Sequence, residues 1–180
     1  MSWFKRKREF AEEADALAED IESEFDTIAE ALNGLVQMGS VTASKDTSLS
    51  GAFEAEVEIP GTEKTLTLER SSLVLVSTTF DFDLSSGTYG STSPNAKGFV
   101  QGFLKVDGAK QPRYAELAIK RESRVQVTVP ANNLVALSAG NHTLELAAEP
   151  LHEPNASNYN ATVWHAATGY SYVVIPNPEP

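Results

Sequence analysis

The chain of 180 residues contains no cysteine, which excludes disulfide bonds, thiol catalysis and thiolate metal sites. It also lacks any apolar run of about 18 residues, the length that a membrane-spanning helix requires. No membrane span is therefore expected. The basic N-terminus is followed by acidic residues rather than by an apolar segment, so we do not expect export through a secretion signal.

Basic residues are scarce and unevenly placed. Fourteen Lys and Arg stand against 25 Asp and Glu, which gives a formal net charge of −11. Lys5, Arg6, Lys7 and Arg8 form a basic tip, whereas residues 9–30 carry ten acids and no base. Because nucleic-acid binding needs clustered positive charge, the acidic body argues against nucleic acid as a partner. The tip is suited to an anionic surface.

An apolar stripe with spacings of three and four residues runs through residues 1–37 and predicts a long N-terminal α-helix. About 30 helical residues would extend about 45 Å. The stripe is too narrow to bury a lone helix, so we expect a coiled coil or docking on another protein. The alternative is a helix folded back on the rest of the chain. Acidic flanks offer no Glu–Lys pairs between copies, which opposes self-association. The predicted helix seam is Phe10, Ala14, Leu17, Ile21, Phe25, Ile28, Leu32 and Leu35.

The rest of the chain has the pattern of an all-β protein. Residues 38–51 are rich in Ser, Thr and Gly and are interpreted as a linker. Within residues 52–180, alternating apolar residues and regularly spaced turns predict short strands, and Asp107-Gly108 predicts a hairpin. These patterns favour an antiparallel β-sandwich of the jelly-roll type as the head domain. The predicted strands lie near 64–69, 72–82, 98–106, 111–119, 123–129, 134–137, 142–148, 161–167 and 171–176.

No residue pattern indicates catalysis or metal binding. The three histidines, His142, His152 and His165, lack the spacing of metal ligands. We interpret His142 as a turn cap and the other two as surface residues. Residues 81–87 lack most ligands of a calcium loop, and serine-nucleophile, phosphate-loop and paired-carboxylate signatures are missing. The sequence therefore predicts a protein that is not an enzyme and that uses no metal or cofactor.

Residues 149–170 are interpreted as a long polar loop that carries aromatic side chains. Tyr159, Trp164 and Tyr170 lie near Asn and Ser residues, a combination that can stack on sugar rings and bond to hydroxyl groups. Alternatively, Trp164 and Tyr170 are core residues of the last two strands. The first interpretation makes these three aromatic residues a contact for a glycan or a protein receptor.

Several stretches of the β region share a recognisable pattern. "GFVQGFLKVDG" (98–108) ends in Asp-Gly, "NNLVALSAGNHTLELAAE" (132–149) turns at Ala-Gly before an alternating strand, and "YSYVVIP" (170–176) closes the domain. Together with "TEKTLTLERSSLVLVSTTFDF" (62–82), they resemble the small jelly-roll domains of tailed-bacteriophage structural proteins. The resemblance covers residues 50–176. It implies that an N-terminal helix attaches the protein to the virion and that the β domain faces outward, usually as a trimer.

Two functional hypotheses follow. In the first, the chain is a virion structural protein of the minor tail, head-fibre or decoration type, and its partners are capsid, neck or tail proteins. Its aromatic anchors and basic tip would then fill a partner pocket. In the second, the β domain binds a receptor or glycan on the host surface. The predicted partner-binding residues are Trp3, Phe4, Lys5, Arg6, Lys7, Arg8 and Phe10.

Overall fold

The computed structural model describes residues 37–49, 55–86, 97–120, 124–152 and 159–176. The chain divides into two compact units, Met1–Gln37 and Met38–Pro180. The predicted helix of residues 1–37, with its seam and its basic tip, lies outside the described residues except for Gln37. In the part of the chain that is described, no helix is long and apolar enough to cross a membrane.

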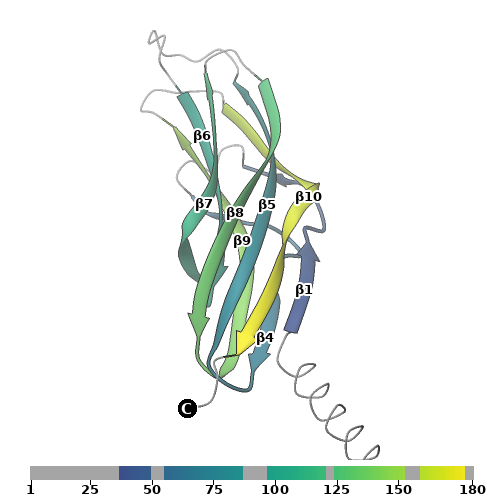
Figure 1. Cartoon of the computed structure of the whole chain (residues 1–180). Helices are drawn as coiled ribbons and strands as arrows, with labels where there is room; N and C mark the ends of the chain where they lie inside the picture. The colour runs from purple at the N-terminus through teal and green to yellow at the C-terminus, as the bar shows by residue number, and fades with distance from the viewer. Residues whose placement is uncertain (1–36, 50–54, 87–96, 121–123, 153–158, 177–180) are drawn as a thin grey trace, which may run out of the picture. The chain divides into compact units, whose positions relative to one another are not determined.

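The described residues form β-strands that pair antiparallel in two sheets (Figure 1). In sheet A, the strand order is β1-β10-β5-β8, and β2 also pairs with β10. In sheet B, the order is β3-β9-β6-β7, and β4 also pairs with β9. The strands are β1 (Gln37–Thr42), β2 (Thr47–Ser48), β3 (Val57–Glu58), β4 (Lys64–Leu68), β5 (Ser72–Ser86), β6 (Lys97–Val106), β7 (Ala109–Lys120), β8 (Arg124–Leu137), β9 (Gly140–His152) and β10 (Tyr159–Pro176).

The connections confirm a mainly β, jelly-roll-like fold. Strand β5 pairs with β10, and β6 pairs with β9, so the ladders nest along the chain. The two strands at the centre of this nesting along the chain, β7 and β8, are the edge strands of their sheets and lie at the same side of the sandwich. There the Asn133 amide donates to the Arg113 carbonyl at 3.1 Å and accepts from the Arg113 N–H at 3.4 Å. This nesting is the topology of a jelly roll.

The core lies between the sheets because one face of each long strand is apolar. On β5, for example, Val74, Val76, Phe80, Phe82 and Leu84 are all fully buried, while the odd-numbered residues from Leu73 to Asp81 face away from the core. The sheets approach closely where Gly102 on β6 meets the Phe80 ring. A Cβ atom at position 102 would lie 2.5 Å from a ring carbon, so only glycine fits there.

Two boundary predictions differ from the structure. The segment 38–51, interpreted as a linker, contains β1 and β2, and its backbone bonds to strand β10 and to the turn that follows β3. Ala43 N–H donates to the Thr168 carbonyl at 2.9 Å, and Ser44 N–H donates to the Pro60 carbonyl at 2.8 Å. Serine and threonine suit this segment as strand residues with one exposed face.

The predicted strands near 123–129 and 134–137 form the single strand β8, and those near 161–167 and 171–176 form β10. Pro130 does not end β8, because β8 is the outermost strand of sheet A and can lack one backbone donor. In β10, the register shifts between Trp164 and Gly169, so the intervening residues form an irregular bulge rather than a turn.

The predicted hairpin at Asp107-Gly108 is confirmed. Both residues have positive φ angles, 51° and 76°, as a two-residue turn between β6 and β7 requires. The Asp107 carboxylate accepts from the Thr143 N–H at 2.8 Å and pairs with His142 Nδ1 at 2.7 Å. His142 Nε2 lies 3.0 Å from the Ser138 carbonyl, so His142 caps the turn before β9, as predicted.

Candidate functional site

The outer face of sheet A, which points away from sheet B, changes character along its length. Along β5 it presents Leu73 and Leu75, then Ser77 and Thr79, and finally Asp81, because alternate residues of a strand share a face. The neighbouring strands β8 and β10 follow the same progression. An apolar end, a hollow and a polar region around Trp164 therefore lie in sequence on one continuous surface.

The polar region, called here the Trp164 site, consists of Asp81, Asp83, Arg124, Gln126 and Trp164. Trp164 lies opposite Asp81 on β5 and is 36% exposed, whereas its neighbour Val163 is buried in the core. The Arg124 guanidinium donates two hydrogen bonds, of 3.1 and 2.7 Å, to the Asp83 carboxylate. The Trp164 indole N–H lies on the side of Asp83 and contributes to lowering the pKa of that carboxyl group. The polar edge of the ring therefore lies toward the site, while part of its surface reaches solvent.

The ionised form of Asp83 is stabilised by its partners. The Arg124 guanidinium holds the pKa of Asp83 below its ordinary value, and the Trp164 indole adds to this effect. Asp81 accepts a 3.3 Å bond from the Gln126 amide. With two carboxylates and one guanidinium, the Trp164 site has a net charge of −1. Acceptor oxygens, amide and guanidinium donors and an aromatic surface are therefore gathered on one face.

A hollow of about 360 Å³ adjoins the Trp164 site where the β10 bulge leaves space between β1 and β5. Thr168 holds the bulge in place, since its hydroxyl accepts from the Asp81 N–H at 3.0 Å and its carbonyl from the Ala43 N–H. Small side chains, many with hydroxyl groups, surround the space. The lining residues are Ser40, Val41, Thr42, Ser77, Thr79, Ala166, Ala167, Thr168, Gly169, Tyr170 and Ser171.

The apolar end lies where β5 begins and β10 finishes. Leu75 pairs across the sheet with both Leu134 and Val173, and the next row contains Ile175. Leu134, Ile175 and Leu75 are 64%, 48% and 40% exposed. Met38 on β1 is 70% exposed. Apolar side chains gathered on an outer face in this way are typical of a contact surface.

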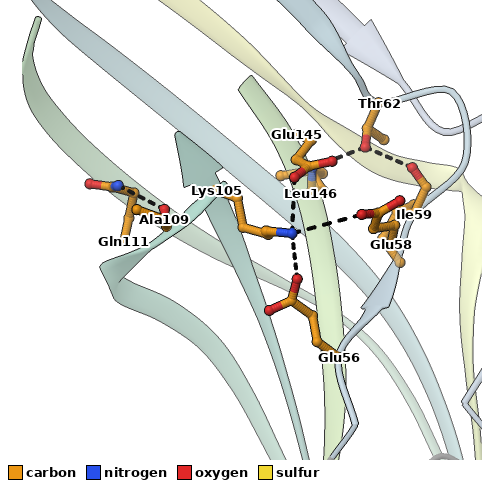
Figure 2. A network of polar contacts seen from close by, with 9 residues as sticks. All are labelled: Glu56, Glu58, Ile59, Thr62, Lys105, Ala109, Gln111, Glu145 and Leu146. Atoms are coloured by element: carbon orange, nitrogen blue, oxygen red, sulfur yellow. Dashed lines mark hydrogen bonds and ion pairs between the residues drawn. The ribbon is translucent and has the colours of Figure 1, made fainter. Parts of the chain in front are cut away.

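The outer face of sheet B differs because its charged groups are paired with one another (Figure 2). Lys105 on β6 is buried among three carboxylates, with its Nζ 2.5 Å from Glu56, 3.0 Å from Glu145 and 3.8 Å from Glu58. Bonds to Glu56 and Glu145 raise the pKa of Lys105. This Lys105 cluster joins β6 and β9 to the segment at β3, and we interpret it as structural.

Phe103 extends this paired surface. Its ring points to the outer face of sheet B yet is fully buried, and Lys110 Nζ lies 3.9 Å from the ring centroid. Lys110 also forms an ion pair with Glu149. The face is therefore a small second core under a cover of ion pairs. Tyr114 on β7 is the exposed aromatic residue beside it, at 46%.

The structure separates the three aromatic residues that were predicted as glycan or receptor contacts. Trp164 is on the surface, but the prediction is wrong for Tyr170, which is 4% exposed. The Tyr170 hydroxyl donates to the Thr62 carbonyl at 3.0 Å inside the sandwich, and burial raises its pKa. The side chain of Tyr159 lies outside the described residues. The region 149–170 is not one long loop, because strands β9 and β10 occupy most of it.

The other predicted sites divide into those that the structure describes and those that it does not. The predicted partner-binding residues and the helix seam lie outside the described residues. Among the described residues, no group of three His, Asp or Glu side chains is placed to hold a metal ion. His165 is a surface residue as predicted, and its Nδ1 lies 2.6 Å from Asp46.

The Trp164 site and the hollow were only partly visible in the sequence. The sequence drew attention to residues 81–87 only as an incomplete calcium loop, and to Trp164 as an aromatic contact. Nothing placed them together, because β5, β8 and β10 come together only through pairings across about 40 to 90 residues. The only local signal for the hollow was the run of small residues, Ala166 to Gly169, which interrupts the alternation of β10.

Comparison with known proteins gives no family. No family model matches the sequence, and no curated protein matches it. Three solved structures are similar in fold. Eiger TNF from S. frugiperda is 7% identical over 81% of this chain and 97% of its own, with a TM-score of 0.41. A structure of infectious bursal disease virus Gt strain is 12% identical over 78% of this chain and 32% of its own, with a TM-score of 0.42. Murine APRIL at pH 5.0 is 8% identical over 78% of this chain and 98% of its own, with a TM-score of 0.40.

Proposed function

We propose that the chain is a bacteriophage virion structural protein, of the minor tail, head-fibre or decoration type. Its N-terminal segment attaches it to a capsid, neck or tail protein, and the β-sandwich is displayed outward, with a trimer as the favoured assembly. Trp3, Phe4 and the basic tip are the proposed anchors. The resemblance of the β region to phage jelly-roll domains motivates this proposal.

The observation that supports it is the way in which the chain enters the sandwich. Strand β1 begins at Gln37, the residue at which the N-terminal unit ends. It lies antiparallel along β10 (Figure 1), and the chain after it is bonded to β10 through Ala43 and to the turn after β3 through Ser44. The N-terminal segment therefore continues directly into a strand that is hydrogen-bonded within sheet A. This arrangement suits a domain that is held by its N-terminus.

Removing the anchor tests the proposal. A chain of residues 37–180 should keep the β circular-dichroism spectrum but should be lost from purified virions of the phage that encodes it. A second variant is the full chain with Trp3→Ala and Phe4→Ala. It should also reduce incorporation, and it should leave the β-sandwich unchanged. If the full chain is a monomer by light scattering and the truncated chain is incorporated normally, the proposal is wrong.

The Trp164 site favours a second candidate function, contact with a host-surface glycan or protein. A partly exposed tryptophan is suited to contact, because its large ring turns about few bonds and little side-chain freedom is lost on binding. A cell-binding assay with the host bacterium tests this function. Trp164→Ala should weaken binding, whereas Tyr114→Ala, which removes a similarly exposed ring from sheet B, should not. Equal binding by both variants would eliminate the Trp164 site as the contact.

A further inference from the structure

We propose that the Trp164 site and the adjoining hollow together bind a neutral saccharide of at least two rings. This inference rests on the second candidate function and names the class of ligand. It assigns one ring to Trp164 and the next to the hollow at the β10 bulge.

Trp164 supplies the apolar contact. Sugar rings present faces of C–H groups that pack against an aromatic ring, and a tryptophan has few rotatable bonds to lose when they do so. Part of the indole surface is exposed, and the neighbouring Asp83 is held by Arg124 through two bonds. Trp164 is on the same face as Asp81, so a ring placed on the indole has a carboxylate within its reach.

The polar groups favour a neutral ligand. Asp81 and Gln126 supply an acceptor and an amide beside the indole, and saccharide hydroxyl groups can bond to both. The positive charge of Arg124 is offset by Asp83, with which the guanidinium forms two bonds. Sialic acids, uronic acids and sulfated sugars would therefore meet net repulsion.

The hollow provides room for a second ring. Its volume of about 360 Å³ lies at the lower end of the range for small-molecule pockets. Thr79 belongs to the hollow and is two residues from Asp81 on the same face of β5, while Ala166 is two residues from Trp164 on β10. The two parts are thus contiguous. Hydroxyl groups of Ser40 and Ser77 give the hollow uncharged donors and acceptors, and the Thr79 hydroxyl, which donates to the Gly169 carbonyl at 3.4 Å, adds an acceptor.

Fluorescence of Trp164 tests the proposal directly. The chain has two tryptophans, so Trp3→Phe in the full chain leaves Trp164 as the single reporter. This protein is titrated with lactose, maltotriose, cellotriose and chitotriose, and with sialyllactose and trigalacturonic acid as anionic counterparts. We expect at least one neutral saccharide to change the emission saturably, with affinity at least about tenfold above that of the anionic sugars.

Variants separate the two halves of the site, with calorimetry as the readout where the tryptophan is removed. Trp164→Ala should lower affinity at least about tenfold. Ser77→Ile, which fills the hollow, should reduce a trisaccharide to the affinity of its monosaccharide. Tyr114→Ala on sheet B is the matched control and should leave binding unchanged.

Three results would overturn the inference: no saturable response to any neutral saccharide of this panel, equal binding after Trp164→Ala, or tighter binding of the anionic sugars. The first of these, combined with cell binding that still depends on Trp164, would show that the site contacts a protein. Saccharide binding without cell binding would support this inference and refute the second candidate function.

Discussion

The outer faces of the two sheets differ in whether their side chains are paired or covered by other residues of the chain. On sheet B, Lys105 is surrounded by carboxylates, and Phe103 is covered by the Lys110–Glu149 ion pair. On sheet A, Trp164 and Leu134 are left partly exposed beside a hollow. Both faces belong to the same sandwich and contain similar numbers of strands, so the contrast comes from side chains rather than from topology.

This contrast indicates which face is available for contact with a partner molecule. A surface whose charges already pair internally gains little from a partner, because each partner contact must replace a bond that exists. Exposed apolar and aromatic residues gain by being covered. Substitutions on sheet B should therefore cost stability, and substitutions on sheet A should cost binding. The following predictions test that division, from the largest expected effect to the smallest.

Phe103→Ala should cause the largest loss of stability. The ring is fully buried although it lies outside the main core, so its removal leaves a cavity under Lys110. We expect a loss of about 3–5 kcal/mol in the free energy of unfolding, measured by urea denaturation. Phe103→Leu, which keeps most of the volume, should lose less. A loss below about 1 kcal/mol for Phe103→Ala would mean that the face of sheet B is not a second core.

Lys105→Met should be the next most damaging change. It keeps the length of the side chain but leaves Glu145, which is mostly buried, next to Glu56 without the compensating cation. We expect a loss of about 1–3 kcal/mol at neutral pH, since Glu56 and Glu58 are exposed and can turn to solvent. The double variant Lys105→Met, Glu145→Gln should recover part of the loss. No recovery would show that the charge pairing is incidental.

The general fold was predictable because its signals are local. Alternation along β5, the Asp107-Gly108 turn and the Gly-centred turn before β9 act over a few residues, and they predict a β-sandwich wherever the strands finally pair. Strand limits were less predictable. Whether Pro130 interrupts a strand depends on its place at the edge of a sheet, which is a property of the tertiary structure.

The candidate site shows the same limit more sharply. Trp164 and Tyr170 are six residues apart, an even spacing that puts both on one face of a regular strand. In the structure they face opposite sides, because the five-residue step from Trp164 to Gly169 on β10 lies opposite a two-residue step from Asp81 to Thr79 on β5. A bulge of this kind depends on Thr168 and on the β1 backbone, so the sequence of β10 alone does not reveal it.

A change of pH should have a smaller effect on stability, and it should act at the turn before β9 in sheet B but not at the Trp164 site. Both ring nitrogens of His142 face acceptors, the Asp107 carboxylate and the Ser138 carbonyl, so both bonds form only when the ring is protonated. Asp107 accordingly raises the pKa of His142 above its ordinary value of 6.5. Its stabilisation is complete below pH 6.5 and is lost as the pH rises through the higher pKa of the folded state.

The expected loss is about 1 kcal/mol between pH 5.5 and pH 8.5, the size of one hydrogen bond, and urea denaturation across that range measures it. His142→Gln should remove this dependence. Trp164 fluorescence in the Trp3→Phe chain should not change over the same range, since the Arg124 guanidinium lowers the pKa of Asp83 and keeps that pair charged. A parallel change in Trp164 emission would mean that the Trp164 site is coupled to the His142 turn.

Leu134→Ser should have the smallest effect on stability. This side chain is 64% exposed on the apolar end of sheet A, so its removal uncovers little and should change the free energy of unfolding by no more than about 0.5 kcal/mol. Its consequence should instead be seen in association, measured by light scattering of the full chain, because the apolar end is suited to being covered. Leu66→Ser on β4, where the leucine is buried, is the matched control and should be strongly destabilising. If Leu134→Ser destabilises the chain as much as Leu66→Ser does, sheet A has no free apolar end, and the two outer faces are equally structural.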